Sequence, residues 1–143
     1  TNTLPLGQAG KYKISVEDLA TTRIKEYDFI DVHVYPIDIY GRWKDDFSIV
    51  AQQLDQVQDF QRRHAPNTPI WITETGAPES YALNYYENLM QYVNENKAIQ
   101  AVFSYAYETD DPNRTYSIFK DLYMVDQKGN QTAAWGYLLG LIK

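Results

Sequence analysis

The architecture of this chain is indicated most strongly by the segment Ile70-Trp71-Ile72-Thr73-Glu74-Thr75-Gly76-Ala77-Pro78. The segment begins as an apolar run and passes through one carboxylate, Glu74, to the backbone breakers glycine and proline. An apolar run of this length between Pro69 and Gly76 predicts a buried strand. Glu74 is then expected at the carboxyl end of that strand, where α/β folds place their ligand crevice. Its position leaves two roles open: a functional acid, or a structural acid whose charge lies near the N-terminus of the next helix.

Strands and helices are predicted to alternate on both sides of this segment. The predicted strands are residues 29–35, 70–74 and 101–107. The predicted helices are residues 16–27, a helix capped by Asp45 or Asp46, a helix opened by Pro78, and residues 133–141. Residues 1–13 contain Pro5, Gly7 and Gly10 and are expected to form a loop. The alternation predicts βαβ units with a parallel sheet, in a single domain covering residues 1–143.

Two of the predicted helices have a recognisable apolar face. The apolar positions are Phe47, Val50, Leu54 and Val57 in the helix after Asp46, and Ala82, Tyr85, Tyr86, Leu89 and Val93 in the helix after Pro78. Both helices are therefore expected to pack against the sheet.

Composition argues against several classes of protein. The chain has 143 residues, of which 44% are hydrophobic, and a net charge of −6. An acidic chain does not suit nucleic acid, because phosphate binding needs a basic face, and no apolar run approaches the ~20 residues that span a bilayer. The chain has no cysteine, so neither a disulfide nor a thiolate zinc site is possible. Because neither histidine belongs to a metal-ligand cluster and no glycine-rich phosphate loop is present, we expect no metal and no organic cofactor.

Aromatic and polar side chains point to a sugar-binding surface. Thirteen tyrosines help to raise the aromatic content to 15%, and tyrosine offers an apolar face with a polar edge, as sugars require. Polar groups also end each predicted strand, and in a parallel sheet these ends meet at one edge. These groups are His33, Tyr35, Glu74, Tyr105, Tyr107 and Glu108. The sequence therefore predicts a reactive pocket at this edge.

Three of the strand motifs resemble those of a known group of enzymes. The segment 71–78 resembles the nucleophile strand of retaining glycoside hydrolases of clan A, and its Glu-Thr-Gly-x-Pro form is close to glycoside hydrolase family seventeen, the β-1,3-glucanase group. Val32-His33-Val34-Tyr35-Pro36 resembles the preceding strand, and residues 103–108 resemble the final strand. The resemblance implies an α/β fold that is part of a (β/α)8 TIM barrel, covering about its last three to four β/α units. A secreted or cell-wall-associated protein is favoured, although the absence of a signal peptide before Thr1 fits either a cytosolic protein or a mature chain.

The resemblance also implies roles for individual residues. Glu74 would be the nucleophile, Tyr35 its hydrogen-bond partner, and His33 a polar neighbour, although His33 could equally be a core histidine bonded to a backbone carbonyl. Trp43, in the loop after the first strand, would either stack on a sugar ring or anchor its loop. Substrate would also contact Tyr105, Tyr107 and Glu108 from the last strand.

Several features depart from that family pattern. A full barrel has eight strands in roughly 250 residues, so the acid/base residue is expected outside this chain. In the family the acid/base glutamate follows an asparagine on an earlier strand. Asn94-Glu95 has this pair of residues but falls at the end of a predicted helix. The last strand also lacks the tryptophan of many clan members. A second chain or a copy of this one is a candidate to complete the barrel. The alternatives are a non-catalytic carbohydrate-binding half-barrel and an unrelated α/β domain in which Glu74 only caps a helix.

Overall fold

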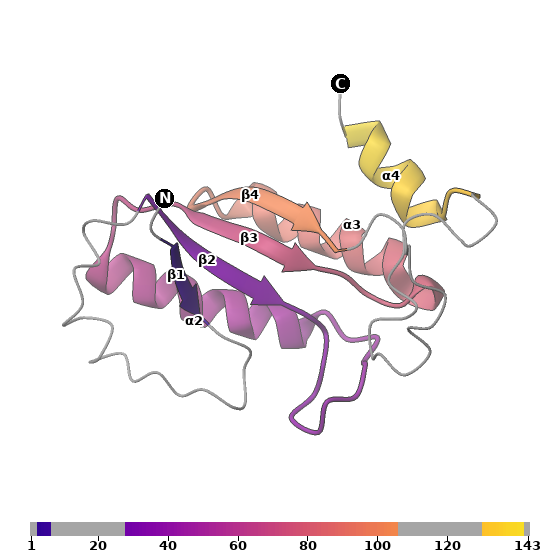
Figure 1. Cartoon of the computed structure of the whole chain (residues 1–143), viewed down its shortest axis with the longest axis horizontal. Coiled ribbons are helices and arrows are strands. Elements are labelled where there is room, and N and C mark those ends of the chain that lie inside the picture. The colour runs from indigo at the N-terminus through magenta and orange to yellow at the C-terminus, as the bar shows by residue number, and fades with distance from the viewer. Residues whose placement is uncertain (1–2, 7–27, 106–129, 142–143) are drawn as a thin grey trace.

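The computed structural model describes residues 3–6, 28–105 and 130–141. Its elements are β1 (Thr3–Leu6), β2 (Phe29–Val34), α2 (Ser48–His64), β3 (Ile70–Thr75), α3 (Glu79–Glu95), β4 (Ile99–Ser104) and α4 (Ala133–Leu141). The four strands form one parallel sheet in the order of the chain, β1-β2-β3-β4, as Figure 1 shows. The α/β alternation predicted from the sequence is therefore confirmed.

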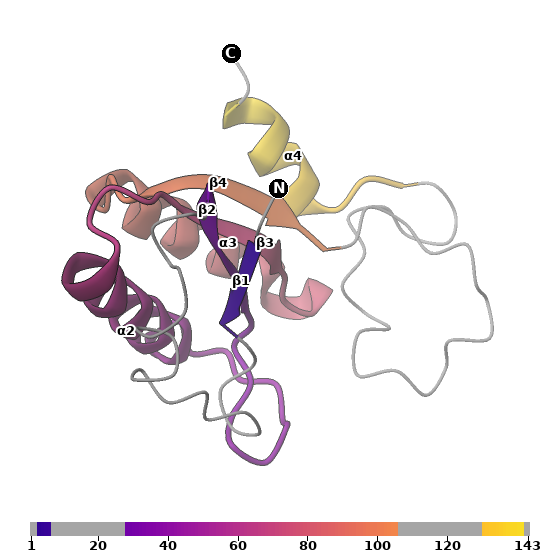
Figure 2. The ribbon, with the colours of Figure 1, turned by 60° about the vertical axis from the view of Figure 1, so that its left-hand side comes forward.

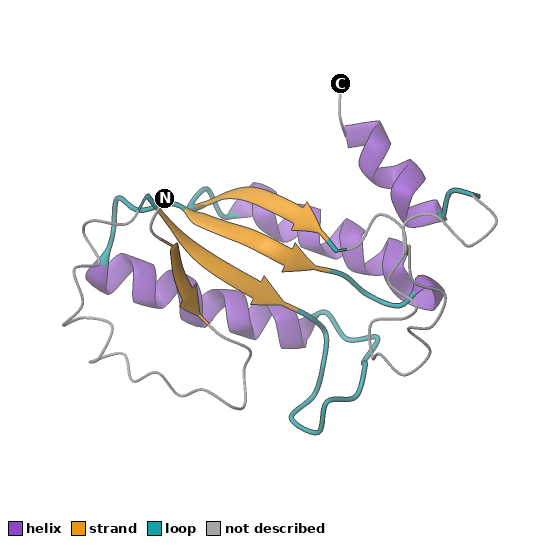
Figure 3. Cartoon of the chain, in the orientation of Figure 1, coloured by secondary structure: helices purple, strands orange, loops and turns teal. Residues whose placement is uncertain are grey.

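The two long helices α2 and α3 cover one face of the sheet (Figure 3). Alternate residues of β2 point toward this face, because successive strand side chains point to opposite sides: Ile30, Val32 and Val34 are buried. The core that they form with the helices also contains Val50, Leu54, Val57, Phe60, Ile70, Ile72, Ala82, Tyr85, Tyr86 and Leu89. The predicted apolar faces of both helices thus pack as expected, with Phe47 and Val93 only partly buried.

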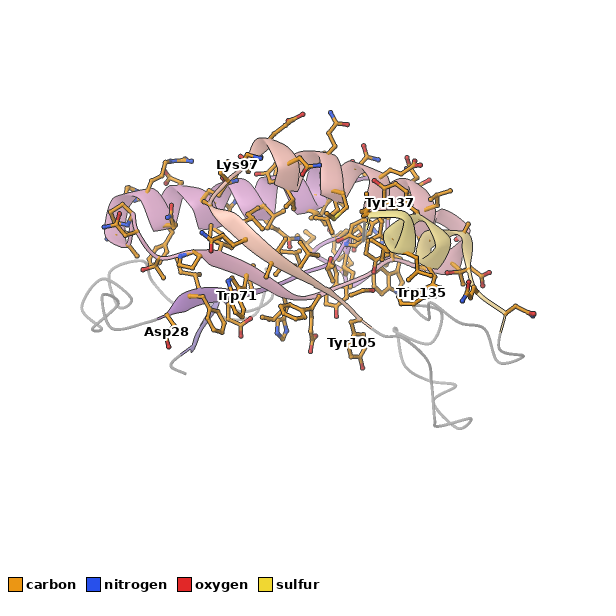
Figure 4. All side chains as sticks on the ribbon, turned by 90° about the horizontal axis from the view of Figure 1, so that it is seen from above. Asp28, Trp71, Lys97, Tyr105, Trp135 and Tyr137 are labelled. Carbon is orange, nitrogen blue, oxygen red and sulfur yellow. The ribbon has the colours of Figure 1, made fainter. Side chains whose placement is uncertain are left out.

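The other face of the sheet carries a different set of side chains. Figure 4 shows Trp71 and Tyr105 on the side of the sheet away from α2 and α3. Phe29 stacks on Trp71 with ring centroids 4.1 Å apart, and Phe103, also beside Trp71, is exposed. This face carries the polar residues considered below. It is called the open face here, because no helix of the described residues covers it.

The structure corrects the sequence prediction at the N-terminus. Residues 1–13 were expected to form a loop, but Thr3–Leu6 is a strand that pairs in parallel with β2. Pro5 is compatible with this position, because β1 lies at an edge of the described sheet, where a missing N–H group is tolerated. Pairing with β2 thus outweighs the local turn signals of proline and glycine.

Several element boundaries also differ: β2 ends at Val34 rather than at residue 35, and β3 ends at Thr75 rather than at residue 74. The last strand begins at Ile99, two residues before the predicted start, because Ile99 pairs with Ile70 of β3 and is buried, and the strand ends at Ser104. The N-cap of α2 is Phe47 rather than an aspartate, although Asp46 accepts a 3.0 Å hydrogen bond from the backbone N–H of Ser48. The predicted helix 16–27 lies outside the described residues. No helix in the described ranges is long and apolar enough to cross a membrane.

Candidate active site

A β-bulge directs Glu74 to the open face. The pairing of β2 with β3 shifts between Val32 and His33, so that Val32 lies opposite Ile72 but His33 lies opposite Glu74. Thr73 is the extra residue, and both Thr73 and Glu74 are partly exposed, while Ile72 and Thr75 on either side are buried. Strict alternation would have pointed Glu74 toward the helices together with Ile72. Bulges commonly re-aim a side chain in this way next to active sites.

Two side chains of the neighbouring strand hold the Glu74 carboxylate. The Tyr35 hydroxyl donates a 3.1 Å hydrogen bond to Glu74 Oε2, which is the contact expected from the sequence. His33 Nδ1 lies 3.2 Å from the same oxygen, and the side chains of His33 and Glu74 are 39% and 38% exposed. The carboxylate is thus fixed by two partners and still accessible from outside.

Tyr35 is suited to remain a hydrogen-bond donor. Its side chain is buried, with 5% exposure. Burial raises its pKa strongly, and the charge of Glu74 and the hydrogen bond to it raise the pKa further. A neutral phenol beside Glu74 is therefore the favoured form, since ionisation would place two negative charges together in a partly dehydrated site.

His33 lies between two carboxylates. Its Nε2 atom is 3.9 Å from Asp31 Oδ1, on the side opposite the contact with Glu74. Asp31 in turn accepts a hydrogen bond from the Thr73 hydroxyl. The alternative of a core histidine bonded to a backbone carbonyl is wrong, because the side chain is partly exposed and faces acidic groups on both sides. The sequence analysis does not identify Asp31 and Thr73 as site residues. Only their positions could have indicated them, since Asp31 lies two residues before His33 and Thr73 lies one residue before Glu74.

A hydroxyl network anchors the strand end behind Glu74. The Thr75 hydroxyl is buried, donates a 2.9 Å hydrogen bond to the carbonyl of Val34, and contacts the Tyr85 hydroxyl of α3. The Tyr86 hydroxyl donates to the Thr75 carbonyl at 3.2 Å and lies 2.6 Å from Ser104 Oγ. Burial raises the pKa of Tyr86 to about 12, against a smaller opposing effect of the Ser104 contact. Thr75 therefore connects β2, β3 and α3.

Trp43 lies beside this site. Its ring meets the ring of Tyr35 edge to face, with centroids 5.9 Å apart, and its backbone forms an isolated antiparallel bridge with Ile37. These contacts agree with the second of the two roles considered for Trp43, which is to anchor its loop. Because the side chain is only partly buried, a contact with substrate remains a prediction.

The remaining predicted residues come from the last strand. Tyr105 follows β4 directly and its backbone N–H donates a 2.8 Å hydrogen bond to the Thr75 carbonyl, so its backbone is joined to the strand that carries Glu74. Its side chain lies on the open face (Figure 4). Tyr107 and Glu108 lie outside the described residues. The described ranges contain no group of three acidic, histidine or cysteine side chains that could hold a metal ion.

Glu74 does not act as a helix cap. The N-cap of α3 is Pro78, and the helix has no side-chain capping hydrogen bond. The contacts of Glu74 are instead with Tyr35 and His33. The helix-cap interpretation of the sequence is therefore wrong.

Comparison with known proteins identifies the family. A family model described as "glycosyl hydrolase catalytic core" matches residues 19–137. The chain belongs to this family. No curated protein matches the sequence.

Solved structures share the fold of this chain at low sequence identity. A β-glucuronidase of Faecalibacterium prausnitzii superposes with a TM-score of 0.64 and 11% identity over 97% of this chain and 24% of its own length. The endo-β-1,4-glucanase Xac0029 of Xanthomonas axonopodis pv. citri superposes with a TM-score of 0.62 and 14% identity over 86% of this chain and 39% of its own length. A β-glucuronidase of Ruminococcus gnavus superposes with a TM-score of 0.61 and 15% identity over 81% of this chain and 23% of its own length.

These similarities define the fold. The chain spans between about a quarter and two fifths of the length of these glycosidases. With its four parallel strands in chain order, it corresponds to part of a (β/α)8 barrel, which confirms the expected fold class.

Proposed function

We propose that this chain carries the nucleophile of a retaining β-glycosidase, and that Glu74 is that nucleophile. The observation that supports the proposal best is the position of Glu74 at the carboxyl end of β3, held by the Tyr35 hydroxyl and beside His33 yet still accessible. Active sites of (β/α)8 enzymes lie at this end of the strands. Membership of the glycosyl hydrolase family and the resemblance of residues 71–78 to a clan A nucleophile strand support the same role.

The geometry suggests which oxygen would react. Both contacts of Glu74 among the described residues fall on Oε2, so Oε1 is the oxygen available to the sugar. In the first step, Oε1 forms a bond to the anomeric carbon while the bond from that carbon to the leaving oxygen breaks. Water then attacks the same carbon and releases Glu74. Tyr35 and His33 hold the carboxylate in place during both steps.

The reaction also needs an acid/base residue, with the two carboxyl groups about 5–5.5 Å apart. We propose that a segment outside residues 1–143, a second chain or a copy of this one supplies it. Glu95 does not serve, because it is exposed at the end of α3 and bonded to Gln91. Helix α3 covers the face of the sheet opposite to Glu74.

The proposed substrate is a neutral β-glucan, with β-1,3-glucan as the first candidate. The family-seventeen resemblance of the Glu-Thr-Gly-Ala-Pro segment supports the β-1,3 linkage, and the similar structures are named as β-glucuronidases and an endo-β-1,4-glucanase. A glucuronide would require a cation for its carboxylate. The cations of the loop after β2, Arg42 and Lys44, are paired with Asp38, which favours a neutral sugar.

A substrate that needs no protonated leaving group tests the role of Glu74 directly. The probe is a dinitrophenyl 2-deoxy-2-fluoro-β-glucoside. Its dinitrophenolate group leaves without an acid catalyst, and the fluorine slows hydrolysis of the glycosyl-enzyme that forms. We expect the intact chain to gain the mass of one fluoroglucosyl group, located on Glu74 by peptide mapping. Glu74→Gln should show no adduct, whereas Glu79→Gln, an exposed acid of α3, should react like the parent. An adduct that persists in Glu74→Gln would refute the assignment.

Carbohydrate binding without cleavage is the second candidate. It is favoured by one observation: the other carboxylate beside His33 is Asp31, which is already bonded to Thr73 and is poorly placed to donate a proton to a leaving group. Incubation with laminarin distinguishes the two functions. New reducing ends would support hydrolysis, while binding without products and without a covalent adduct would support the binding function.

A further inference from the structure

The loop after β2 forms a short ordered hairpin. It projects beyond the carboxyl end of β2 in two different views (Figures 1 and 2). Ile37 and Trp43 form the antiparallel bridge at its base, and the backbone N–H of Asp38 donates a 2.9 Å hydrogen bond to the Arg42 carbonyl. Gly41, with φ of +77°, closes the turn, and only glycine adopts that conformation without strain. This segment is called the 37–43 hairpin below.

Asp38 fixes the conformation of the hairpin from within. Its Oδ1 atom accepts hydrogen bonds from the backbone N–H groups of Tyr40 and Arg42, at 2.9 and 3.0 Å. Its Oδ2 atom accepts from the Arg42 guanidinium at 2.9 Å and lies 3.4 Å from Lys44 Nζ. Although partial desolvation opposes the effect, these hydrogen bonds and the Arg42 charge lower the pKa of Asp38 to about 2. The tip is therefore ordered by contacts within the hairpin itself.

This ordered tip exposes two large apolar side chains. Ile39 and Tyr40 are 84% and 75% exposed, and every other exposed large hydrophobic residue of the described ranges is below 50%. The Arg42 guanidinium carbon lies 4.9 Å from the Tyr40 ring centroid and covers one side of the ring. A rigid aromatic ring with one face supported and the other in water is arranged to stack on a flat apolar surface.

We propose that the 37–43 hairpin is a remote oligosaccharide subsite, with Tyr40 as the stacking platform for a sugar ring. The inference rests on the function proposed above. Glu74 contacts Tyr35, and Tyr35 contacts Trp43 at the base of the hairpin. Tyr40 lies farther out, at the tip. A saccharide bound at Glu74 and extending along the hairpin meets Trp43 first and Tyr40 next, so Tyr40 contacts only the longer oligosaccharides.

The size and charge of the tip favour a sugar over a protein. A standard protein interface buries about 800 Å² on each partner, far more than two side chains offer. One aromatic ring matches one pyranose ring, whose C–H face is apolar and whose rim is hydroxylated. Asp38 pairs with both Arg42 and Lys44 and offsets one of their two positive charges, so the tip keeps only a small net charge and does not select an ionic ligand.

Oligosaccharide length is the variable that tests this subsite. The probes are laminaribiose and laminarihexaose, with binding to the full chain measured by titration calorimetry. Tyr40→Ala should weaken laminarihexaose about tenfold, which equals about 1.4 kcal/mol, and should leave laminaribiose unchanged. Tyr40→Phe should bind both sugars like the parent, because it keeps the ring. Leu83→Ala, which removes an exposed apolar side chain of α3, should also have no effect.

Each of the following outcomes would contradict the proposed subsite. Equal affinity of Tyr40→Ala and parent for laminarihexaose, or equal weakening of both sugars, would exclude a remote stacking role. A change in self-association without a change in sugar affinity would show that the tip contacts another copy of the chain. Failure to bind either sugar at millimolar concentration would overturn the subsite and count against the glycosidase proposal as well. Covalent labelling of Glu74 tests that proposal separately, because a monosaccharide label does not reach Tyr40.

Discussion

Replacing Thr75 with valine should destabilise the chain by an amount that its contacts determine. Valine has nearly the same shape, so the core stays filled and only the hydroxyl is lost. The Val34 carbonyl and the Tyr85 hydroxyl, both buried, then lose this partner. Each buried polar group left unsatisfied costs about 1–3 kcal/mol. With partial relaxation we expect Thr75→Val to lower the free energy of unfolding by about 2–4 kcal/mol.

The assay is equilibrium unfolding in urea, followed by tyrosine and tryptophan fluorescence. The midpoint should fall while the slope stays unchanged, since the surface exposed on unfolding is the same. Thr75→Ser keeps the hydroxyl and should lose only about 1 kcal/mol for the missing methyl group. These two variants separate the hydroxyl from the packing.

A double-mutant cycle with Tyr85→Phe tests the cause of the loss. If the cost of Thr75→Val comes from stranding the Tyr85 hydroxyl, then the cost is smaller by at least about 1 kcal/mol when that hydroxyl is already absent. Additive effects of the two substitutions, or a Thr75→Val variant within about 0.5 kcal/mol of the parent, would refute the reasoning.

Three further predictions address the site, the hairpin and the core. Tyr35→Phe removes a hydrogen bond to a carboxylate and should slow covalent labelling of Glu74 about tenfold; an unchanged rate in a mass-spectrometric time course would contradict this. The pKa of Asp38 falls from 3.8 to about 2 on folding, so its stabilisation of the hairpin is complete above pH 4 and is lost as pH falls through about 2. The amide NMR shifts of Tyr40 should therefore titrate near pH 2, and a midpoint near pH 4 would contradict the Asp38 contacts. Leu54→Ala, at a fully buried position of α2, should cost about 2–5 kcal/mol in urea unfolding, and a loss below about 1 kcal/mol would be inconsistent with the described core.

Local patterns were sufficient for most of the fold. The strand at residues 70–74, the helix after Pro78 and the helix at residues 133–141 were predicted because their apolar spacing and end signals agree. The strand at Thr3–Leu6 was missed, because its existence depends on pairing with β2, and because Pro5 within it and Gly7 and Gly10 after it are typical of a loop. The start of β4 was placed too late, since Gln100 hides the strand signal that begins at Ile99.

The site was predictable to the extent that it depends on strand ends. In a parallel sheet the carboxyl ends of neighbouring strands meet, which was enough to bring His33, Tyr35 and Glu74 together. The network around Thr75 was not predictable, because it joins positions ten and more residues apart through buried hydroxyl groups. A threonine next to a glycine carries no local sign of such contacts.

The bulge in β3 explains why the stability of the chain and the direction of Glu74 both depend on Thr75. Without the extra residue, Glu74 would follow Ile70 and Ile72 onto the helix-covered face, where an unpaired carboxylate is strongly disfavoured. With it, Thr73 and Glu74 both face the open side, and Thr75 enters the core. A bulge weakens the strand pairing locally, so another contact must hold the shifted register. The hydroxyl of Thr75 provides that contact through Val34 and the tyrosines of α3, and the carboxylate one residue earlier is fixed as a consequence.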